Sequence, residues 1–314
     1  MDNAFLHPLY MIGSAIIGLA AGALFDCSQA SVLIEPLLIV MLFFVFTCIS
    51  LREVGDSFAN GRFTLTAVFI NFVWTPVFAL MLGLMFPQID VRIGLLMLLI
   101  TPCTDWYLIF TSAAKGNVPL SSSLLPVNLI LQILLMPAYI LLFFNTSVPI
   151  DAADLLLSMA VVLVIPIAAS ALVKLLSVHS AGIRRFDDAV VKRGDNLQLT
   201  FLCLAIAAMF ASQSSELLNN LDLFVKLLIP LILFFIVNYA VASLLSKLQK
   251  YDRRDTTSLI FTSMARNSPL ALAIAAAAFP SNTLLLLVLV IGPLIELPIL
   301  SITAGYRLKK AGSD

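Results

Sequence analysis

The chain has 314 residues, of which 61% are hydrophobic and 11% are charged, and its mean hydropathy is +1.05. A soluble domain of average composition is far more polar, so this composition indicates an integral membrane protein. The 18 acidic and 18 basic residues give no net charge, which argues against a nucleic-acid-binding protein. Cys27, Cys48, Cys103 and Cys203 show no C-x2-C spacing, so neither a zinc site nor a disulfide framework is expected.

Apolar stretches long enough to cross a bilayer, about 20 residues each, predict ten transmembrane helices. They cover residues 6–25, 31–50, 63–86, 92–115, 119–144, 151–174, 195–213, 221–246, 255–279 and 282–306. With this layout all but three of the 18 Lys and Arg residues fall on one side of the membrane; Arg92 and Lys226 fall on the other, and Arg266 lies inside a span. Because cytoplasmic loops collect Lys and Arg, both termini of a multi-pass protein of the cell membrane are expected in the cytoplasm.

A short outer loop at residues 145–150 divides the ten spans into two sets of five. Because five is odd, the second set enters the membrane from the opposite side, so any repeat must be inverted. The sequence therefore predicts a single all-α membrane domain over residues 1–314, with one repeat at about 6–144 and the other at about 151–306. In such an arrangement the fourth span corresponds to the ninth, and the fifth to the tenth.

The fourth span contains the polar run Thr-Pro-Cys-Thr-Asp-Trp at residues 101–106. Pro102 removes a helix hydrogen bond, and Thr104 or Asp105 can accept the amides of a new helix start. A charge such as that of Asp105 costs about 2.5 to 3.5 kcal/mol at the centre of a membrane helix, so it should face protein or water. Secondary transporters build substrate sites at such broken helices, because freed backbone groups supply ligands. We therefore predict a broken helix and a substrate site near the membrane midplane.

The ninth span carries a matching run, Thr-Ser-Met-Ala-Arg-Asn-Ser-Pro, at residues 262–269. Ser268 followed by Pro269 is typical of a helix restart, with the serine as the N-cap. The fourth and ninth spans are then broken in opposite senses and are expected to cross at their breaks. This crossing favours a salt bridge between Asp105 and Arg266 as part of the substrate site. The alternative is a purely structural pair that only stabilises the crossing.

The fifth and tenth spans also carry polar side chains at depth, including Asn128 and Glu296. Burial favours the uncharged form of a carboxyl group, so Glu296 suits a group that takes up and releases a proton during a transport cycle. The alternative is a structural carboxyl group that is hydrogen-bonded between helices.

Cys103 lies inside the first break, where its thiol is exposed to whatever fills the cavity. Sulfur ligands select soft centres, so this thiol can ligate a soft, thiophilic element. Cys48 and Cys203 are expected to behave as small apolar side chains.

At these residues the chain resembles the bile acid:sodium symporter superfamily, and within it most resembles the arsenite permeases of arsenical resistance. The resemblance rests on Pro-Cys-Thr at residues 102–104 and on Ile-Gly-Pro-Leu-Ile-Glu-Leu-Pro at residues 291–298, and the ten-helix layout covers the whole chain. It implies export of arsenite, and often antimonite, by proton antiport, with Cys103 as the arsenite ligand and Glu296 as the proton-coupling residue. It also implies a panel part and a core part, with the two broken helices crossing in the core.

The chain differs from both branches of the superfamily at the breaks. Asn267 and Ser268 match the polar pair of the sodium-coupled members, but Thr262 stands where those proteins have an acidic residue for sodium. The permeases have a small or apolar residue at the position of Asp105, and they have no arginine at that of Arg266. Because the cation of Arg266 would occupy or repel a nearby sodium site, protons rather than sodium are the expected coupling ion.

These observations predict a secondary active transporter, an arsenite/antimonite efflux permease coupled to protons. The alternative is an organic-anion carrier, in which the arginine and the amino ends of the half-helices bind a carboxylate. An enzyme is not expected, since His7 and His179 lie at the membrane edges and only one aspartate lies at depth. No cofactor is expected, and the partners are a small inorganic or organic solute and the lipid bilayer. The predicted substrate-binding residues are Cys103, Thr104, Asp105, Asn128, Arg266, Asn267 and Ser268.

Overall fold

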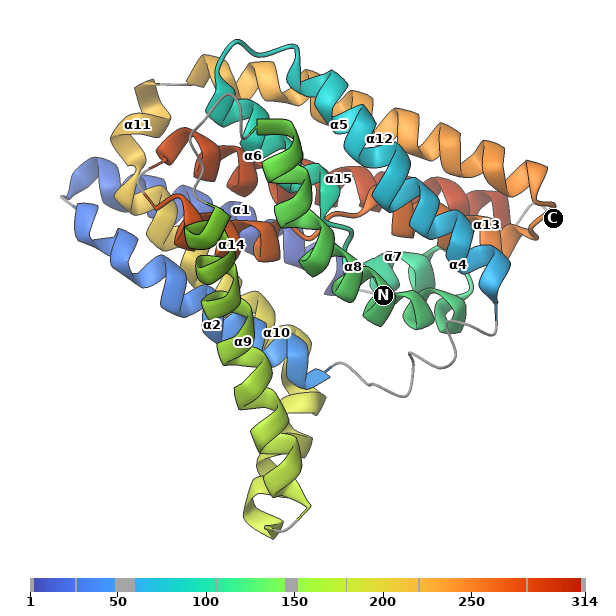
Figure 1. Cartoon of the computed structure of the whole chain (residues 1–314), viewed down its shortest axis with the longest axis horizontal. Coiled ribbons are helices and arrows are strands. Elements are labelled where there is room, and N and C mark those ends of the chain that lie inside the picture. The colour runs from blue at the N-terminus through green and yellow to red at the C-terminus, as the bar shows by residue number, and fades with distance from the viewer. Residues whose placement is uncertain are drawn as a thin grey trace.

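The computed structural model describes residues 3–25, 27–48, 60–104, 107–144, 152–178, 180–219, 221–280 and 282–311. These residues are almost entirely helical, and they contain no strand. The first half of the chain forms α1 (Asn3–Leu24), η1 (Ser28–Leu33), α2 (Ile34–Cys48), α4 (Gly61–Phe69), the π-helix η2 (Ile70–Trp74), α5 (Thr75–Gly83), α6 (Ile89–Ile100), α7 (Tyr107–Ala113) and α8 (Val118–Phe144). The second half forms α9 (Ala152–Ser177), α10 (Ala181–Ser212), α11 (Ser214–Asn219), α12 (Leu221–Leu248), α13 (Arg253–Met264), α14 (Ser268–Ala278) and α15 (Thr283–Ala311) (Figure 1).

Several of these helices are long and apolar enough to cross a membrane. Within the described ranges, five uninterrupted stretches meet this requirement, and they are Ser28–Cys48, Gly61–Gly83, Val118–Phe144, Asp222–Leu248 and Thr283–Lys310. A sixth results if the two parts of α10, which are bent by 67° relative to each other, are counted as one span. The chain is therefore a multi-pass, all-helical membrane protein.

The connection before the seventh apolar stretch differs from its prediction. The apolar part of α10 begins at Asn196, where the span was expected, but the charged connection before it is itself helical from Ala181. Ser180 caps it, because its hydroxyl oxygen accepts a hydrogen bond from the amide of Ile183 at 3.5 Å. Hydropathy reports where a helix can lie in lipid, but it does not exclude a helix in the charged stretch that precedes the bend.

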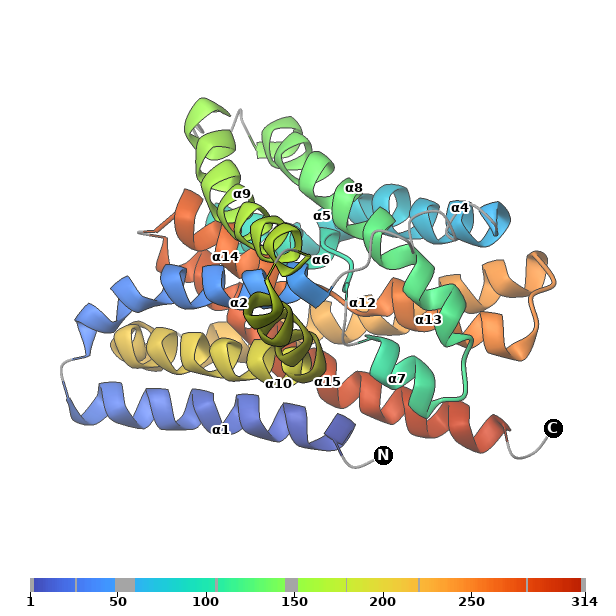
Figure 2. The same ribbon diagram turned by 90° about the horizontal axis from the view of Figure 1, so that it is seen from below.

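The helices form two groups. α1, α2, α9 and α10 pack on one another, and we call this group the panel. The helices α4 to α8 and α12 to α15, with η2, form the core, in which α6 packs on α15 and α12 packs on α13. Figure 2 shows α1, α10 and α2 side by side, with α9 crossing them. α14 joins the two groups, because it contacts α2 and α9 of the panel as well as α15 of the core.

Close helix packing holds the panel together. A Cβ atom placed on Gly18 or Gly22 of α1 would come closer to the backbone of Ala207 or Ala211 of α10 than van der Waals contact allows. Small residues at such spacing let two helix backbones approach each other, which is the usual way to stabilise helix pairs in lipid. Close packing of small residues therefore joins α1 to α10 in the panel.

Among the described residues, the core carries most of the buried polar side chains, whereas the panel buries only a few, such as Thr47 and Gln198. Those of the core include Asn71, Asn128, Gln132, Asn238 and Thr262. A buried polar group is costly unless it is hydrogen-bonded, and polar residues at depth in membrane proteins mark functional positions. The core is thus the part of the molecule in which a site is expected.

Candidate functional site

The structure interrupts the helical path at both predicted runs. α6 ends at Ile100 and α7 begins at Tyr107, whereas α13 ends at Met264 and α14 begins at Ser268. The caps at the ends of α6 and α13, Thr101 and Ala265, have extended backbone conformations. The chain therefore leaves the helical conformation at both places.

The two interruptions lie against each other. The amide of Cys103 donates to the carbonyl oxygen of Ala265 at 3.0 Å, and the amide of Asn267 donates to that of Thr101 at 2.7 Å. Pro102 and Arg266 thereby form an isolated antiparallel bridge. Backbone groups freed by a helix break must find partners in an apolar surrounding. Pairing the two breaks satisfies both at once, which explains why they meet.

Asn267 both restarts α14 and links it to the first break. Its side-chain oxygen accepts a hydrogen bond from the amide of Leu270 at 3.1 Å, which makes it the N-cap. Its side-chain nitrogen donates to the hydroxyl of Thr104 at 3.0 Å. The sequence favoured Ser268 as the cap, and this was wrong by one residue, because Pro269 occupies the second rather than the first position of the helix.

Glu296 of α15 reaches the same place. The carboxyl group is buried, and its Oε1 accepts a hydrogen bond from the amide of Arg266 at 2.9 Å. A small cavity of about 10 Å³, with room for about one water molecule, lies beside this bond. The residues that line it are Cys103, Arg266, Asn267, Ser268, Pro269, Pro293, Glu296 and Leu297. The cavity brings the buried thiol, the buried carboxyl group and the amino end of α14 together.

The guanidinium of Arg266 points to backbone carbonyls. Nη1 donates to the carbonyl oxygen of Leu99 at 2.9 Å, Nε donates to that of Met264 at 3.3 Å, and Nη2 donates to that of Ser263. Nη2 also donates to Oδ1 of Asn71 in the π-helix η2 at 3.1 Å. π-Helical insertions are frequent at functional sites.

Phe234 of α12 covers the same guanidinium, with its ring centroid 5.2 Å from Cζ of Arg266. Sequence reasoning missed both this ring and Asn71. Asn71 could have been noticed as an amide inside the apolar third span, shortly before Pro76. Nothing in the sequence marks Phe234 among the other aromatic residues.

Two predicted site residues remain to be placed. Asp105 lies outside the described residues, as does Trp106, so the salt bridge from Asp105 to Arg266 stays a prediction. Asn128 of α8 contacts α13 through its side-chain nitrogen, which is 3.5 Å from the hydroxyl of Thr262. It is not among the described residues that line the small cavity.

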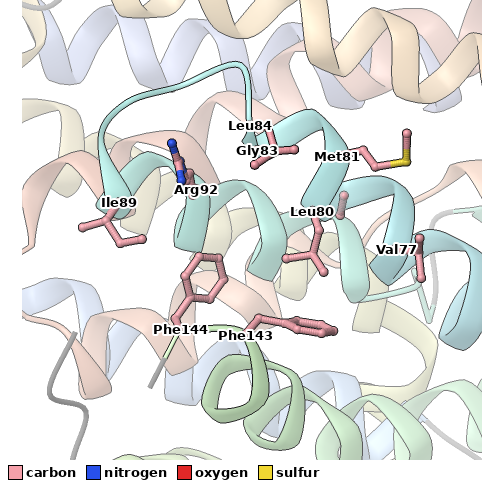
Figure 3. Close-up of a pocket in the computed structure, with 10 residues that line it drawn as sticks. Val77, Leu80, Met81, Gly83, Leu84, Ile89, Arg92, Phe143 and Phe144 are labelled. Atoms are coloured by element: carbon pink, nitrogen blue, oxygen red, sulfur yellow. The ribbon is translucent and has the colours of Figure 1, made fainter. Parts of the chain in front are cut away.

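Larger cavities lie elsewhere and offer different chemistry. One of about 380 Å³ lies between α5, α6 and α8, lined by apolar side chains and by Arg92, whose Nε donates to the carbonyl oxygen of Phe86 (Figure 3). Another of about 650 Å³ lies between α1 and α10 and includes Cys203. Exposed apolar residues such as Met81 and Leu204 line them, so they face the side that lipid covers. Size therefore does not identify the site in this protein.

Comparison with known proteins agrees with this architecture. Residues 35–220, more than half of the chain, match the Sodium Bile acid symporter family. The arsenical-resistance protein Acr3 of Corynebacterium glutamicum is 22% identical over 246 residues, which is 74% of this chain and 66% of that protein, just under two thirds of its length. Acr3 of Alkaliphilus metalliredigens is 22% identical over 315 residues, 93% of this chain and 88% of that protein.

A third relative is the uncharacterized protein YbaS of Bacillus subtilis, which is 28% identical over 247 residues, 78% of each chain. The relatives thus include two proteins with arsenical resistance in their names. From the extent of the family match, the chain belongs to the Sodium Bile acid symporter family, whose members are membrane transporters.

Proposed function

We propose that the protein is a secondary active transporter that exports arsenite, and antimonite, in exchange for protons. The observation that carries this proposal is the small cavity between the two helix breaks, which is lined by both Cys103 and Glu296. A thiol and an acid at one buried place provide a ligand for a thiophilic solute and a site for a proton. The likeness to two Acr3 proteins supports arsenite as the solute.

Cys103 supplies the substrate ligand. Arsenite carries three hydroxyl groups on trivalent arsenic, and the thiol displaces one of them as water, forming an arsenic–sulfur bond without a change in oxidation state. A single sulfur ligand keeps this exchange reversible, as a carrier requires. Asn267 and Ser268 line the same cavity and can form hydrogen bonds with the remaining hydroxyl groups.

Glu296 couples a proton to the helix break. Its ionised carboxyl group accepts the hydrogen bond from the amide of Arg266 more strongly than a neutral one would. Protonation weakens this bond and loosens α15 from the connection between α13 and α14. The cavity has room for about one water molecule, so arsenite can enter only when the surrounding helices separate.

The proposal includes ten spans in two inverted repeats with cytoplasmic termini. The first repeat comprises α1, η1 with α2, α4 with α5, α6 with α7, and α8; the second comprises α9, α10, α12, α13 with α14, and α15. α14 is too short to cross the membrane alone, and it completes a span only together with α13. The fourth span of each set is the broken one, which supports the inverted repeat. Movement of the panel against the core then opens the site to either side.

The organic-anion carrier is less well supported. It requires the guanidinium of Arg266 to bind a carboxylate, but that group donates to the carbonyl oxygens of Leu99 and Met264 and to Asn71. Four of its five N–H donors are therefore already engaged by the protein.

Transport into liposomes tests the proposal. Purified protein is reconstituted, and arsenite and a small carboxylate are supplied under imposed proton or sodium gradients. We expect arsenite transport driven by the proton gradient, loss of this transport in Cys103→Ser, and normal transport in Cys203→Ser. Equal arsenite transport by the wild type and Cys103→Ser would refute the role of the thiol. Carboxylate transport without arsenite transport would refute arsenite as the substrate.

A further inference from the structure

The guanidinium of Arg266 lies where the carboxyl ends of two half-helices meet. Leu99 lies in the last turn of α6, and Ser263 and Met264 are the last two residues of α13. All three carbonyl oxygens accept hydrogen bonds from this one side chain. The carboxyl end of a helix carries a partial negative charge, so two such ends facing each other favour a cation between them.

The fourth oxygen around the guanidinium has the same chemical character. Oδ1 of Asn71 is an amide carbonyl oxygen, presented by the π-helix η2. The oxygen ligands of Arg266 therefore come from three separate segments, and each is a neutral carbonyl group. Hard cations prefer such oxygens, and half-helix carboxyl ends with unwound carbonyls coordinate Na⁺ in secondary transporters.

The side chain that fills this place cannot leave it. Arg266 is 3% exposed, and an arginine keeps its charge at every physiological pH. A dissolved ion can enter and leave such a site during a transport cycle. The guanidinium cannot, because it is covalently attached to a residue of the break itself. The positive charge therefore belongs to the protein permanently.

We propose that Arg266 is a tethered cation that occupies a latent alkali-cation site formed by the ends of α6 and α13 and by Asn71. The transporter then needs no dissolved Na⁺ or K⁺ at this place, and removal of the guanidinium opens the site to such an ion. The proposal concerns cation binding and does not depend on which solute is carried.

A purely structural role for Arg266 predicts a different result. If the side chain only fastens the break, its loss lowers stability by the same amount in every salt. If it stands in for a dissolved cation, the loss is partly restored by a small alkali cation and is not restored by a bulky organic one.

Thermal unfolding of the purified full chain in detergent separates these two cases. The wild type, Arg266→Gln and Arg266→Lys are compared in NaCl, KCl and choline chloride at equal ionic strength. Arg266→Gln removes the charge and keeps a polar side chain, whereas Arg266→Lys keeps a positive charge at the same place.

Arg307 provides the matched control. It is also buried, and it is held by the hydroxyl of Thr257 and the carbonyl oxygen of Arg253, away from the breaks. Arg307→Gln therefore removes a guanidinium that is buried to a similar extent as that of Arg266, without opening the proposed site.

For Arg266→Gln we expect Na⁺ or K⁺ to raise Tm above the choline value by about 2 to 4 °C at roughly ten times the Kd of the ion. For the wild type, Arg266→Lys and Arg307→Gln, the Tm of each protein should be the same in all three salts. If folded Arg266→Gln is obtained only when Na⁺ or K⁺ is present throughout purification, the proposal is equally supported.

Three results would overturn the proposal. They are a specific rise of the wild-type Tm in Na⁺ or K⁺, an equal Tm of Arg266→Gln in all three salts, and failure to obtain folded Arg266→Gln in any of them. None of these measurements uses arsenite, so a failure of the tethered cation is distinguishable from a failure of the proposed function.

Discussion

The panel and the core are both made of strongly apolar helices, yet they differ in what interrupts those helices. In the panel, α1 lies so close to α10 that Gly18 and Gly22 have no room for a side chain. In the core, two helical paths stop, pair through their backbones and surround a buried acid and a thiol. The comparison teaches that apolar composition inserts a helix into the membrane, whereas a few polar groups at depth decide where the chemistry occurs.

Proline alone does not distinguish the two kinds of helix. Pro126 and Pro137 lie inside α8, Pro166 lies inside the panel helix α9, and Pro293 lies inside α15, and these helices continue past them. Pro102 lies in a break whose freed backbone groups have a partner. The carbonyl oxygen of Ala265, in the second break, accepts a hydrogen bond from the amide of Cys103, in the first. A break therefore requires a place for the freed backbone groups as well as a proline.

The largest expected effect comes from removing the acid of the core. Glu296→Gln should reduce proton-driven arsenite transport in liposomes to the level of vesicles without protein, because the amide cannot exchange a proton. The fold should persist, since the glutamine oxygen can still accept the hydrogen bond from the amide of Arg266. Glu35→Gln, at the first turn of the panel helix α2, is the control and should transport normally. Proton-driven transport by Glu296→Gln at the wild-type rate would show that the proton binds elsewhere.

A smaller effect is expected from overpacking the panel. A side chain at Gly22 would collide with the backbone of Ala211, so Gly22→Leu should lower the free energy of unfolding by about 1 to 3 kcal/mol. The preference for arsenite over a carboxylate should not change, because this contact is remote from the cavity residues. Gly13→Leu is the matched control on α1, where a Cβ atom would have no neighbour within 4 Å. Equal stability of the two variants would mean that α1 and α10 do not pack as described.

The smallest effect concerns two helix caps of similar geometry. Asn267 caps α14 and Asn282 caps α15, each through its side-chain oxygen. Replacing either with alanine should cost about 1 kcal/mol of stability. Only Asn267→Ala should also raise the KM for arsenite, because Asn267 lines the cavity and holds Thr104. A similar rise in KM for Asn282→Ala would mean that the effect on transport follows from stability alone.

The sequence predicted the places of the two breaks because each combines a proline with polar residues inside an apolar stretch. It also placed Glu296 at depth in the tenth span, but it did not predict the hydrogen bond that this carboxyl group accepts from the amide of Arg266. It did not predict the partners of the guanidinium, because Asn71 and Phe234 approach from helices that are distant in sequence. The cap of α14 was misplaced by one residue because Asn267 and Ser268 are both good cap residues.

The helical connection at the start of α10 was missed for another reason, since hydropathy does not show where a charged helix begins. Asn128 was predicted from depth alone. Depth identifies a polar residue in a helix, but it does not determine which neighbouring helix that residue faces.

The central claim is that a cysteine of the core, rather than one of the panel, binds trivalent arsenic. X-ray absorption at the arsenic edge on purified protein with bound arsenite tests it most directly, because sulfur and oxygen ligands give distinct scattering. An arsenic–sulfur signal is predicted in the wild type and in Cys203→Ser, and its loss is predicted in Cys103→Ser. An unchanged sulfur signal in Cys103→Ser, or arsenic surrounded only by oxygen in the wild type, would contradict the account.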